Sequence, residues 1–306
     1  MQAATVLFGD ALDFAGRYPP ARLPAGEAIA AHGRLLAAAP WFAGRLVWPV
    51  EELDTLSDGA EGVAPTALPP RTEGAWAISA VTRPVGSDDF QFDLETIAEF
   101  NERHAMEGAA ALCIDSLEAR VESAADIDRA IEAVPDDVFP YLEIAWGKDP
   151  RGLIAALAGV GVGAKLRTGG LDAASHPPVE AVARFMVACA RAEVPFKATA
   201  GMHRAMRHAA PDLGCGQHGF LNLFGAAVLL QAGQLDEAGV SRMLLETTPG
   251  AIKLDTAGLQ WNGIRASMES IAAARRDVVH SWGTCSWEEP MDDLIALGFV
   301  DREVMA

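Results

Sequence analysis

The chain lacks the features that mark secreted and membrane-inserted proteins. Its four cysteines are far apart and form no CxxC pair, which argues against a disulfide framework and favours a reducing cytoplasm. No stretch of about 18 or more apolar residues is free of charge, so no membrane-spanning helix is expected. No basic segment precedes the first acidic residue, Asp10, which argues against a signal peptide. A cytoplasmic location is therefore expected.

Basic residues are also scarce, and lysine is the scarcest of them. The chain has 24 lysines and arginines against 42 aspartates and glutamates, a net charge of −18. This charge repels phosphate backbones and anionic lipids, so neither nucleic acid nor a membrane is expected as a partner. Only four basic residues are lysines, namely Lys148, Lys165, Lys197 and Lys253. A lysine amine can lose its proton and act as a base or nucleophile, whereas a guanidinium cannot, so these positions are candidates for chemistry.

Short apolar runs alternate with amphipathic segments along most of the chain. Runs rich in Val, Ile, Leu and Ala predict eight strands, at residues 45–50, 76–81, 110–115, 138–144, 163–167, 195–199, 251–255 and 278–282. Helical periodicity predicts helices at residues 92–106, 123–134, 150–160, 178–193, 218–233, 235–247, 263–276 and 291–297. Eight strand–helix alternations predict a parallel sheet that closes into a (β/α)8 TIM barrel.

The predicted barrel forms a single domain over residues 1–306. Residues 1–42 are expected to add a helical extension outside the barrel, and residues 51–75, rich in Pro, Gly and Thr, a long loop. A doubly wound open sheet is the alternative fold, but no GxGxxG motif follows the first predicted strand.

Three of the four lysines fall inside predicted strands, and Lys148 follows another strand directly. Because side chains alternate along a strand, Lys165 shares a face with Arg167, Lys197 with Thr199, and Glu143 with Tyr141. If the polar faces point inward, they meet near the carboxyl ends of the strands, where barrel enzymes have their active sites. We take Lys165, Lys197 and Glu143 as candidate catalytic residues, and Arg167 and Thr199 as candidate substrate-binding residues. A salt bridge across the barrel, for instance with Glu143, is the alternative role of a strand lysine.

The segments GAKLRTGG and PFKATAGM carry lysines 32 residues apart on consecutive predicted strands. They resemble the paired K-T-x-T-G and K-x-x-G-G strands of class I aldolases of the deoxyribose-phosphate aldolase type, over about 40 residues. The resemblance implies that Lys165 forms a Schiff base with a carbonyl substrate and that Lys197 lowers its pKa by charge proximity. It also implies an acidic helper, for which Asp115 is the candidate. Two departures are Arg167, where the family has a small hydroxyl residue, and the strand numbers, fifth and sixth rather than sixth and seventh.

The loop after Lys197 is the most basic part of this acidic chain. AGMHRAMRHAAPDLGCGQHG contains His203, Arg204, Arg207 and His218, with Asp212 as its only acid. Such a local excess of positive charge predicts a site for a phosphate or carboxylate, assisted by Arg167. The main-chain N–H groups of the glycines at 169, 170 and 201 could contact the same anion.

A metal site is an alternative use of the same loop. It offers four potential ligands within 16 residues, His203, His208, Cys215 and His218, without a carboxylate close by. In the following predicted loop, TAGLQWNG, Gln260 and Asn262 could donate hydrogen bonds to a substrate. For Cys285, the neighbouring Glu288 and Glu289 argue against a reactive thiolate.

Together these patterns predict a lyase of aldolase type that uses a strand lysine on a small, carbonyl-containing anionic metabolite. No cofactor or metal is expected, and a homo-oligomer is possible. Two alternatives remain open at this point, a metal-dependent barrel enzyme with histidine ligands from residues 203–218 and a non-enzymatic protein that binds an anionic metabolite.

Overall fold

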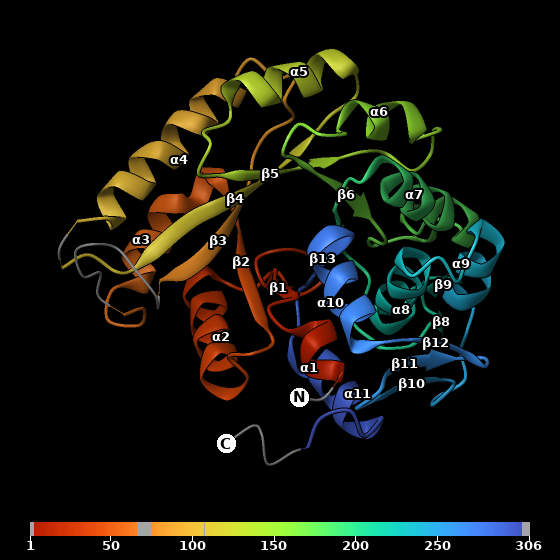
Figure 1. Ribbon diagram of the computed structural model, residues 1–306. Coiled ribbons are helices and arrows are strands. Elements are labelled where there is room, and N and C mark those ends of the chain that lie inside the picture. The colour runs from red at the N-terminus through yellow and green to blue at the C-terminus, as the bar shows by residue number, and fades with distance from the viewer. Residues whose placement is uncertain (1–2, 66–74, 107, 302–306) are drawn as a thin grey trace.

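Eight parallel strands close into a barrel in the computed structural model, which describes residues 3–65, 75–106 and 108–301 (Figure 1). Around the barrel the strands follow the order β1-β13-β7-β6-β5-β4-β3-β2, and β2 closes the ring onto β1. The barrel strands are β1 (Leu12–Phe14), β2 (Ala43–Pro49), β3 (Trp76–Val81), β4 (Leu112–Arg120), β5 (Phe139–Glu143), β6 (Gly163–Arg167), β7 (Phe196–Thr199) and β13 (Val279–Thr284). The predicted (β/α)8 barrel is therefore confirmed.

Helices surround the strands, as expected for this architecture (Figure 1). They are α1 (Ala3–Phe8), α2 (Ala25–Ala38), α3 (Leu53–Ala60), α4 (Phe90–His104), α5 (Ala124–Ala133), α6 (Arg151–Ala156), α7 (Val179–Ala192), α8 (Phe220–Gln231), α9 (Glu237–Leu244), α10 (Met268–Asp277) and α11 (Glu288–Ala296), with 3-10 turns η1 (Val50–Glu52) and η2 (Ala173–Ser175). In the described part of the chain, no helix combines the length and apolar character that crossing a membrane requires.

The N-terminal segment differs from the prediction in one respect. Residues 1–42 contain helices, as expected, namely α1 and α2, but between them lies β1, which pairs with β13 and β2 and is the first strand of the barrel. Residues 251–255, predicted as a barrel strand, instead begin a separate antiparallel sheet of β10 (Ile252–Asp255), β11 (Gly258–Trp261) and β12 (Ile264–Ala266). Lys165 and Lys197 consequently lie on the sixth and seventh barrel strands, so the departure in strand number disappears.

Two further local predictions need correction. The first half of the predicted loop 51–75 is helical, because η1 and α3 occupy it, and residues 66–74 lie outside the described part. The predicted loop after Lys197 contains a short antiparallel hairpin, β8 (His208–Ala210) and β9 (Cys215–Gln217). At α5, Asp126 completes a capping box with Ser123, a role more common for Glu or Gln.

The apolar core lies between the strands and the helices. Trp282 of β13 is fully buried and packs its ring against Phe8, Phe42, Phe220 and Phe224. The side chains that alternate with this outward face point into the barrel, and several of them are polar and buried. Ionised groups in such a place need partners, because an unpaired buried charge is strongly destabilising.

Candidate active site

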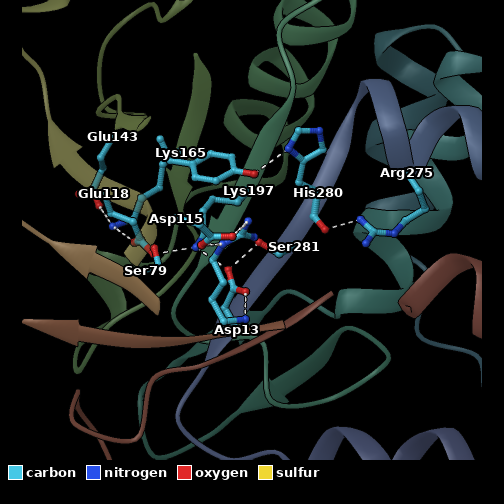
Figure 2. A network of polar contacts seen from close by, with 12 residues as sticks. Asp13, Ser79, Asp115, Glu118, Glu143, Lys165, Lys197, Arg275, His280 and Ser281 are labelled. Carbon is cyan, nitrogen blue, oxygen red and sulfur yellow. Dashed lines mark hydrogen bonds and ion pairs between the residues drawn. The ribbon is translucent and has the colours of Figure 1, made fainter. Parts of the chain in front are cut away.

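Glu118 lies between the two strand lysines inside the barrel. Its Oε2 is 2.7 Å from Lys165 Nζ, and its Oε1 is 2.6 Å from Lys197 Nζ. The lysines occupy neighbouring positions on β6 and β7 and point the same way, so one carboxylate contacts both (Figure 2). Ser79 of β3 donates a further hydrogen bond to Oε1 at 3.0 Å. The two lysines therefore belong to one buried cluster, as the strand alternation predicts.

Asp13 of β1 is the second partner of Lys197. Its Oδ2 accepts hydrogen bonds from Lys197 Nζ and from the Ser281 hydroxyl, the latter at 2.7 Å. Its Oδ1 accepts the main-chain N–H of Arg45 at 2.9 Å. Both Lys197 and Asp13 are 0% exposed, so Lys197 is the deep member of the cluster.

Glu143 is the second partner of Lys165 and connects the cluster to the carboxyl end of the barrel. Its Oε2 lies 2.8 Å from Lys165 Nζ, and its Oε1 lies 3.5 Å from Arg167 Nε. The exposed fraction of the side chain increases along this series of contacts, from 6% for Lys165 to 18% for Glu143 and 51% for Arg167. The predicted salt bridge with Glu143 is thus present, although it joins paired residues of the neighbouring strands β5 and β6 rather than crossing the barrel.

The charges in the cluster fix the protonation states of both lysines. Burial alone would lower the pKa of Lys165, but the charges of Glu118 and Glu143 raise it. Burial likewise opposes the charged form of Lys197, and Asp13 and Glu118 raise the pKa of that amine. The resemblance to class I aldolases implies that Lys197 lowers the pKa of Lys165. The pKa of Lys165 is raised instead, because carboxylates contact both amines. Lys165 is an ammonium in this arrangement.

Tyr18 contributes a hydroxyl that sequence reasoning missed. It follows β1 in the loop toward α2, and its Oη is buried without a hydrogen-bond partner among the described residues. Burial and then the charge of Glu118 raise the pKa of this phenol, which keeps it protonated. Tyr18 therefore offers an unused donor within the electrostatic reach of Glu118.

Asp115 does not contact the lysines. It forms a two-point ion pair with Arg45, whose Nε and Nη2 lie 2.7 and 2.9 Å from the two carboxylate oxygens. The acid that contacts the lysines from β4 is Glu118 instead. The helper role suggested for Asp115 is therefore wrong for this geometry, and Glu118 occupies that place.

Two acids of α11 contact two residues of the predicted anion-binding loop. His203 Nδ1 is 2.9 Å from Glu289 Oε2, and Arg204 Nη2 is 2.9 Å from Asp293 Oδ1. The local positive excess read from the sequence is therefore much reduced, because an acidic helix distant in sequence packs against the loop. His203 and Arg204 are not available as an unpaired anion site.

Arg207 and His218 belong to the β8–β9 hairpin region, and His218 has a structural role. Its Nε2 donates to Pro177 O at 2.9 Å, and burial lowers its pKa to about 4, so the ring is neutral. Arg207 Nη1 lies 3.5 Å from the other ring nitrogen. Burial lowers the Arg207 pKa, and its guanidinium covers the face of Gly216. The assignment of His218 to substrate binding is therefore corrected, whereas that of Arg207 stays a prediction.

The loops after β6 and β7 touch at the carboxyl end of the barrel. Thr168 donates its hydroxyl to Thr199 O at 3.0 Å and to Ala200 O at 2.6 Å. A Cβ on Gly169 would lie 2.8 Å from the Cα of Gly201, so this backbone contact requires glycine. Ala200 has a left-handed φ of 65° directly after Thr199, a conformation that clusters at functional sites. Thr199 and Arg167 thus end adjacent strands beside a tightly fitted pair of loops.

Gln260 and Asn262 lie outside the barrel, on β11 and in the turn after it. With Lys253, Glu246, Thr248 and Trp261 they line a pocket of about 510 Å³ on the separate three-stranded sheet. No lining residue belongs to a barrel strand. Residues 251–255 do not enter the barrel, so this placement does not support a contact with the substrate of Lys165, and that contact stays a prediction.

The potential metal ligands of the 203–218 loop do not converge. His208 Nδ1 contacts Met206 O, while His203 and His218 have the separate partners given above. Across the described ranges, no group of three or more His, Cys, Asp or Glu side chains is arranged to hold a metal ion. The metal-dependent alternative has no ligand set in this part of the chain.

Comparison with known proteins adds no family assignment. No protein-family model matches the chain, and no curated protein is significantly similar to it. The resemblance to class I aldolases stays a prediction that rests on the two strand motifs.

Proposed function

We propose that the chain is a barrel enzyme that uses Lys165 on a small, carbonyl-containing anionic substrate, in a lyase reaction of aldolase type. The observation that carries this proposal is the chain of contacts from Lys165 through Glu143 to Arg167. It gives an amine at the edge of a buried cluster, an adjacent carboxylate that can take its proton, and an exposed cation that can bind an anion. Lys197 is less suited, because it is fully buried between two carboxylates.

Substrate binding supplies a way to deprotonate Lys165. Arg167 lowers the pKa of Glu143 by its charge, as does Lys165, against the opposing effect of burial. A substrate phosphate or carboxylate that pairs with Arg167 would weaken its contact with Glu143 and raise the pKa of that carboxyl. Glu143 then accepts the proton of Lys165 across the 2.8 Å contact, leaving a neutral amine. Glu118 and Lys197 hold their positions and fix the direction of the amine.

The neutral amine can then form a Schiff base. The Lys165 nitrogen attacks the carbonyl carbon, and the carbonyl oxygen becomes a hydroxyl by taking the proton held on Glu143. Loss of this oxygen as water, with a second proton from the nitrogen or Glu143, gives a protonated imine. Glu143, now a carboxylate, takes the proton of the substrate hydroxyl on the carbon β to the imine as the bond between the α and β carbons breaks. The electron pair of that bond passes to the imine, which becomes an enamine, and an aldehyde leaves. Glu143 returns the proton to the α carbon, and water hydrolyses the resulting protonated imine, which releases the second product and the Lys165 ammonium. Tyr18 could donate its hydrogen bond to a substrate oxygen.

The experiment is reductive trapping with sodium borohydride in the presence of small keto acids, aldehydes and sugar phosphates, followed by intact-mass measurement. A covalent adduct in the wild-type protein that disappears in Lys165→Arg supports the proposal. Lys253→Arg is the matched control, because Lys253 is exposed on the separate sheet and should not affect trapping. If no compound is trapped and Lys165→Arg retains any turnover found, Schiff-base chemistry is excluded.

A second candidate is a protein that binds an anionic metabolite without covalent chemistry. It is favoured by the completeness of the ion pairs, since each ammonium has two carboxylate partners and a raised pKa. Ligand-dependent thermal stabilisation without a trapped adduct and without product would support this candidate. Stabilisation accompanied by turnover would exclude it.

A further inference from the structure

A second group of chemically active side chains lies where β13 ends. Cys285 directly follows this strand, and its Sγ is 3.9 Å from His203 Nε2. The other ring nitrogen, Nδ1, is 2.9 Å from Glu289 Oε2, and the Thr284 hydroxyl is 3.5 Å from the same nitrogen. The thiol and the carboxylate thus occupy opposite nitrogens of one imidazole, as in a nucleophile–base–acid triad.

Three separate segments build this arrangement. His203 comes from the loop after β7, Cys285 from the end of β13, and Glu289 from the first turn of α11. The main-chain N–H of Ala21, in the loop after β1, acts to lower the pKa of the Cys285 thiol. All of these segments lie at the carboxyl end of the barrel, where catalytic groups of this fold gather.

The contacts orient the imidazole between the acid and the thiol. In the tautomer with the proton on Nδ1, His203 donates to Glu289 and directs the Nε2 lone pair at the sulfur. Burial and the charge of Glu289 raise the pKa of the Cys285 thiol, although the Ala21 N–H opposes them. The sulfur therefore carries its proton at neutral pH, and an adjacent base is needed when it attacks.

Access is consistent with attack on a small electrophile. Cys285 is 8% exposed, and the side chains of His203 and Glu289 are 18% and 49% exposed. This differs from Cys189, which is fully buried in α7 without a histidine or carboxylate contact of this kind. The sequence argues against a reactive thiolate because of the neighbouring acids, since it does not show that His203 lies between Cys285 and Glu289.

We propose that Cys285, His203 and Glu289 form a catalytic triad that accepts an acyl group from an activated ester or thioester. Cys285 is the nucleophile, His203 the general base, and Glu289 the positioning residue that fixes the imidazole. Sγ forms a bond to the acyl carbon while its proton passes to His203 Nε2. The bond to the leaving alcohol or thiol breaks, and the leaving group takes that proton. Water, deprotonated by His203, then cleaves the thioester and restores the thiol.

This activity does not depend on the lysine chemistry proposed above. No contact in the triad involves Lys165, Glu143 or Glu118. The Lys165→Arg variant is therefore expected to keep the reactivity of Cys285, and Cys285→Ser is expected to keep borohydride trapping. Failure of one proposal leaves the other measurable.

The test uses p-nitrophenyl acetate, with release of p-nitrophenol followed by absorbance and the acetylated residue identified by peptide mass spectrometry. We expect acetyl transfer to Cys285 and its loss in Cys285→Ser. His203→Gln should slow the transfer by about 100-fold, the size typical of a general base. Cys215, half-buried on β9, is the internal reference and should react at an unchanged rate in every variant.

Glu289→Gln and Glu288→Gln form a matched pair for the positioning role. Glu288 is next to Glu289 but bonds to Ser286 and Trp287 rather than to His203, so only Glu289→Gln should slow acetylation. In His203→Ala, added imidazole should restore the reaction, and equally so in His203→Ala/Glu289→Gln, since a free imidazole needs no positioning. Acetylation of Cys215 but not Cys285, or a Cys285 rate insensitive to both His203→Gln and Glu289→Gln, would overturn the proposal.

Discussion

Replacing Glu118 by glutamine should remove the charge that holds the two strand lysines together. In the wild-type cluster, three carboxylates, from Asp13, Glu118 and Glu143, face two ammonium groups. Glu118→Gln leaves each lysine a single carboxylate and turns a side-chain N–H2 toward an ammonium. Glu118 is 2% exposed, so water cannot replace the lost contacts. Breaking a buried ion pair from one side typically costs about 3–5 kcal/mol, and we expect a loss of that size in the free energy of unfolding.

Urea unfolding followed by tryptophan fluorescence measures this loss, because the chain has seven tryptophans. Glu122→Gln is the matched control. Its ion pair with Arg120 is on the surface, with the Glu122 side chain 71% exposed, and such pairs contribute little to stability. A loss below about 1 kcal/mol for Glu118→Gln, or one equal to that of Glu122→Gln, would refute the view that both lysines are charged and depend on Glu118.

Three further predictions concern pH, backbone conformation and charge. Burial lowers the pKa of His32 and of His218 to about 4. Between about pH 6.5 and 4 the unfolded chain therefore binds more protons than the folded chain. The stability present above about pH 6.5 should be lost as the pH falls toward 4. The midpoint of urea unfolding should decrease as the pH is lowered across this range, and it should depend less steeply on pH in His218→Gln. Gly258 has a φ of 131°, and an added Cβ would lie 2.0 Å from a carbonyl oxygen. Gly258→Ala should therefore lower the midpoint of thermal unfolding more than Gly263→Ala, because a Cβ at Gly263 would meet open space. Arg167→Gln should reduce borohydride trapping of anionic carbonyl compounds by about tenfold and leave that of neutral ones unchanged, the size expected for a charge-assisted hydrogen bond.

Most of the barrel could be predicted from the sequence, because long apolar strands and amphipathic helices alternate regularly. β1 could not, because it has only three residues, between two helices. Residues 251–255 have the apolar pattern of a strand, and they form one, but pattern alone does not say which sheet a strand joins. The first error is therefore one of secondary structure, and the second concerns topology alone.

The lysines were predictable, but two of their three acids were not. Glu143 shares the alternation of a regular strand, whereas Asp13 lies on the unrecognised β1. Glu118 lies beyond a register shift in β4: Ile78 pairs with Ile114 and Ser79 with Ser116, so Asp115 is an extra residue. This bulge reverses which residues of β4 face inward. In the sequence, Glu118 is a glutamate three residues past the predicted strand end, with nothing to mark it as buried.

The prediction that His203 and Arg204 are unpaired was wrong for a different reason. The 203–218 loop is basic by composition, but His203 and Arg204 are paired with Glu289 and Asp293, more than 80 residues later in the chain. Charge counted within a segment omits partners from other elements. The same long-range packing created the triad at Cys285, which the sequence alone argued against.

The most direct test of the lysine proposal is to locate the reduced adduct within the chain. After borohydride trapping with a carbonyl compound that binds, peptide mass spectrometry reports which of the four lysines carries the added group. We predict modification of Lys165 alone, because Lys197 is fully enclosed, and Lys148 and Lys253 are exposed outside the barrel strands. An adduct on Lys148 or Lys253 with Lys165 unmodified would contradict the assignment of Lys165 as the reacting amine.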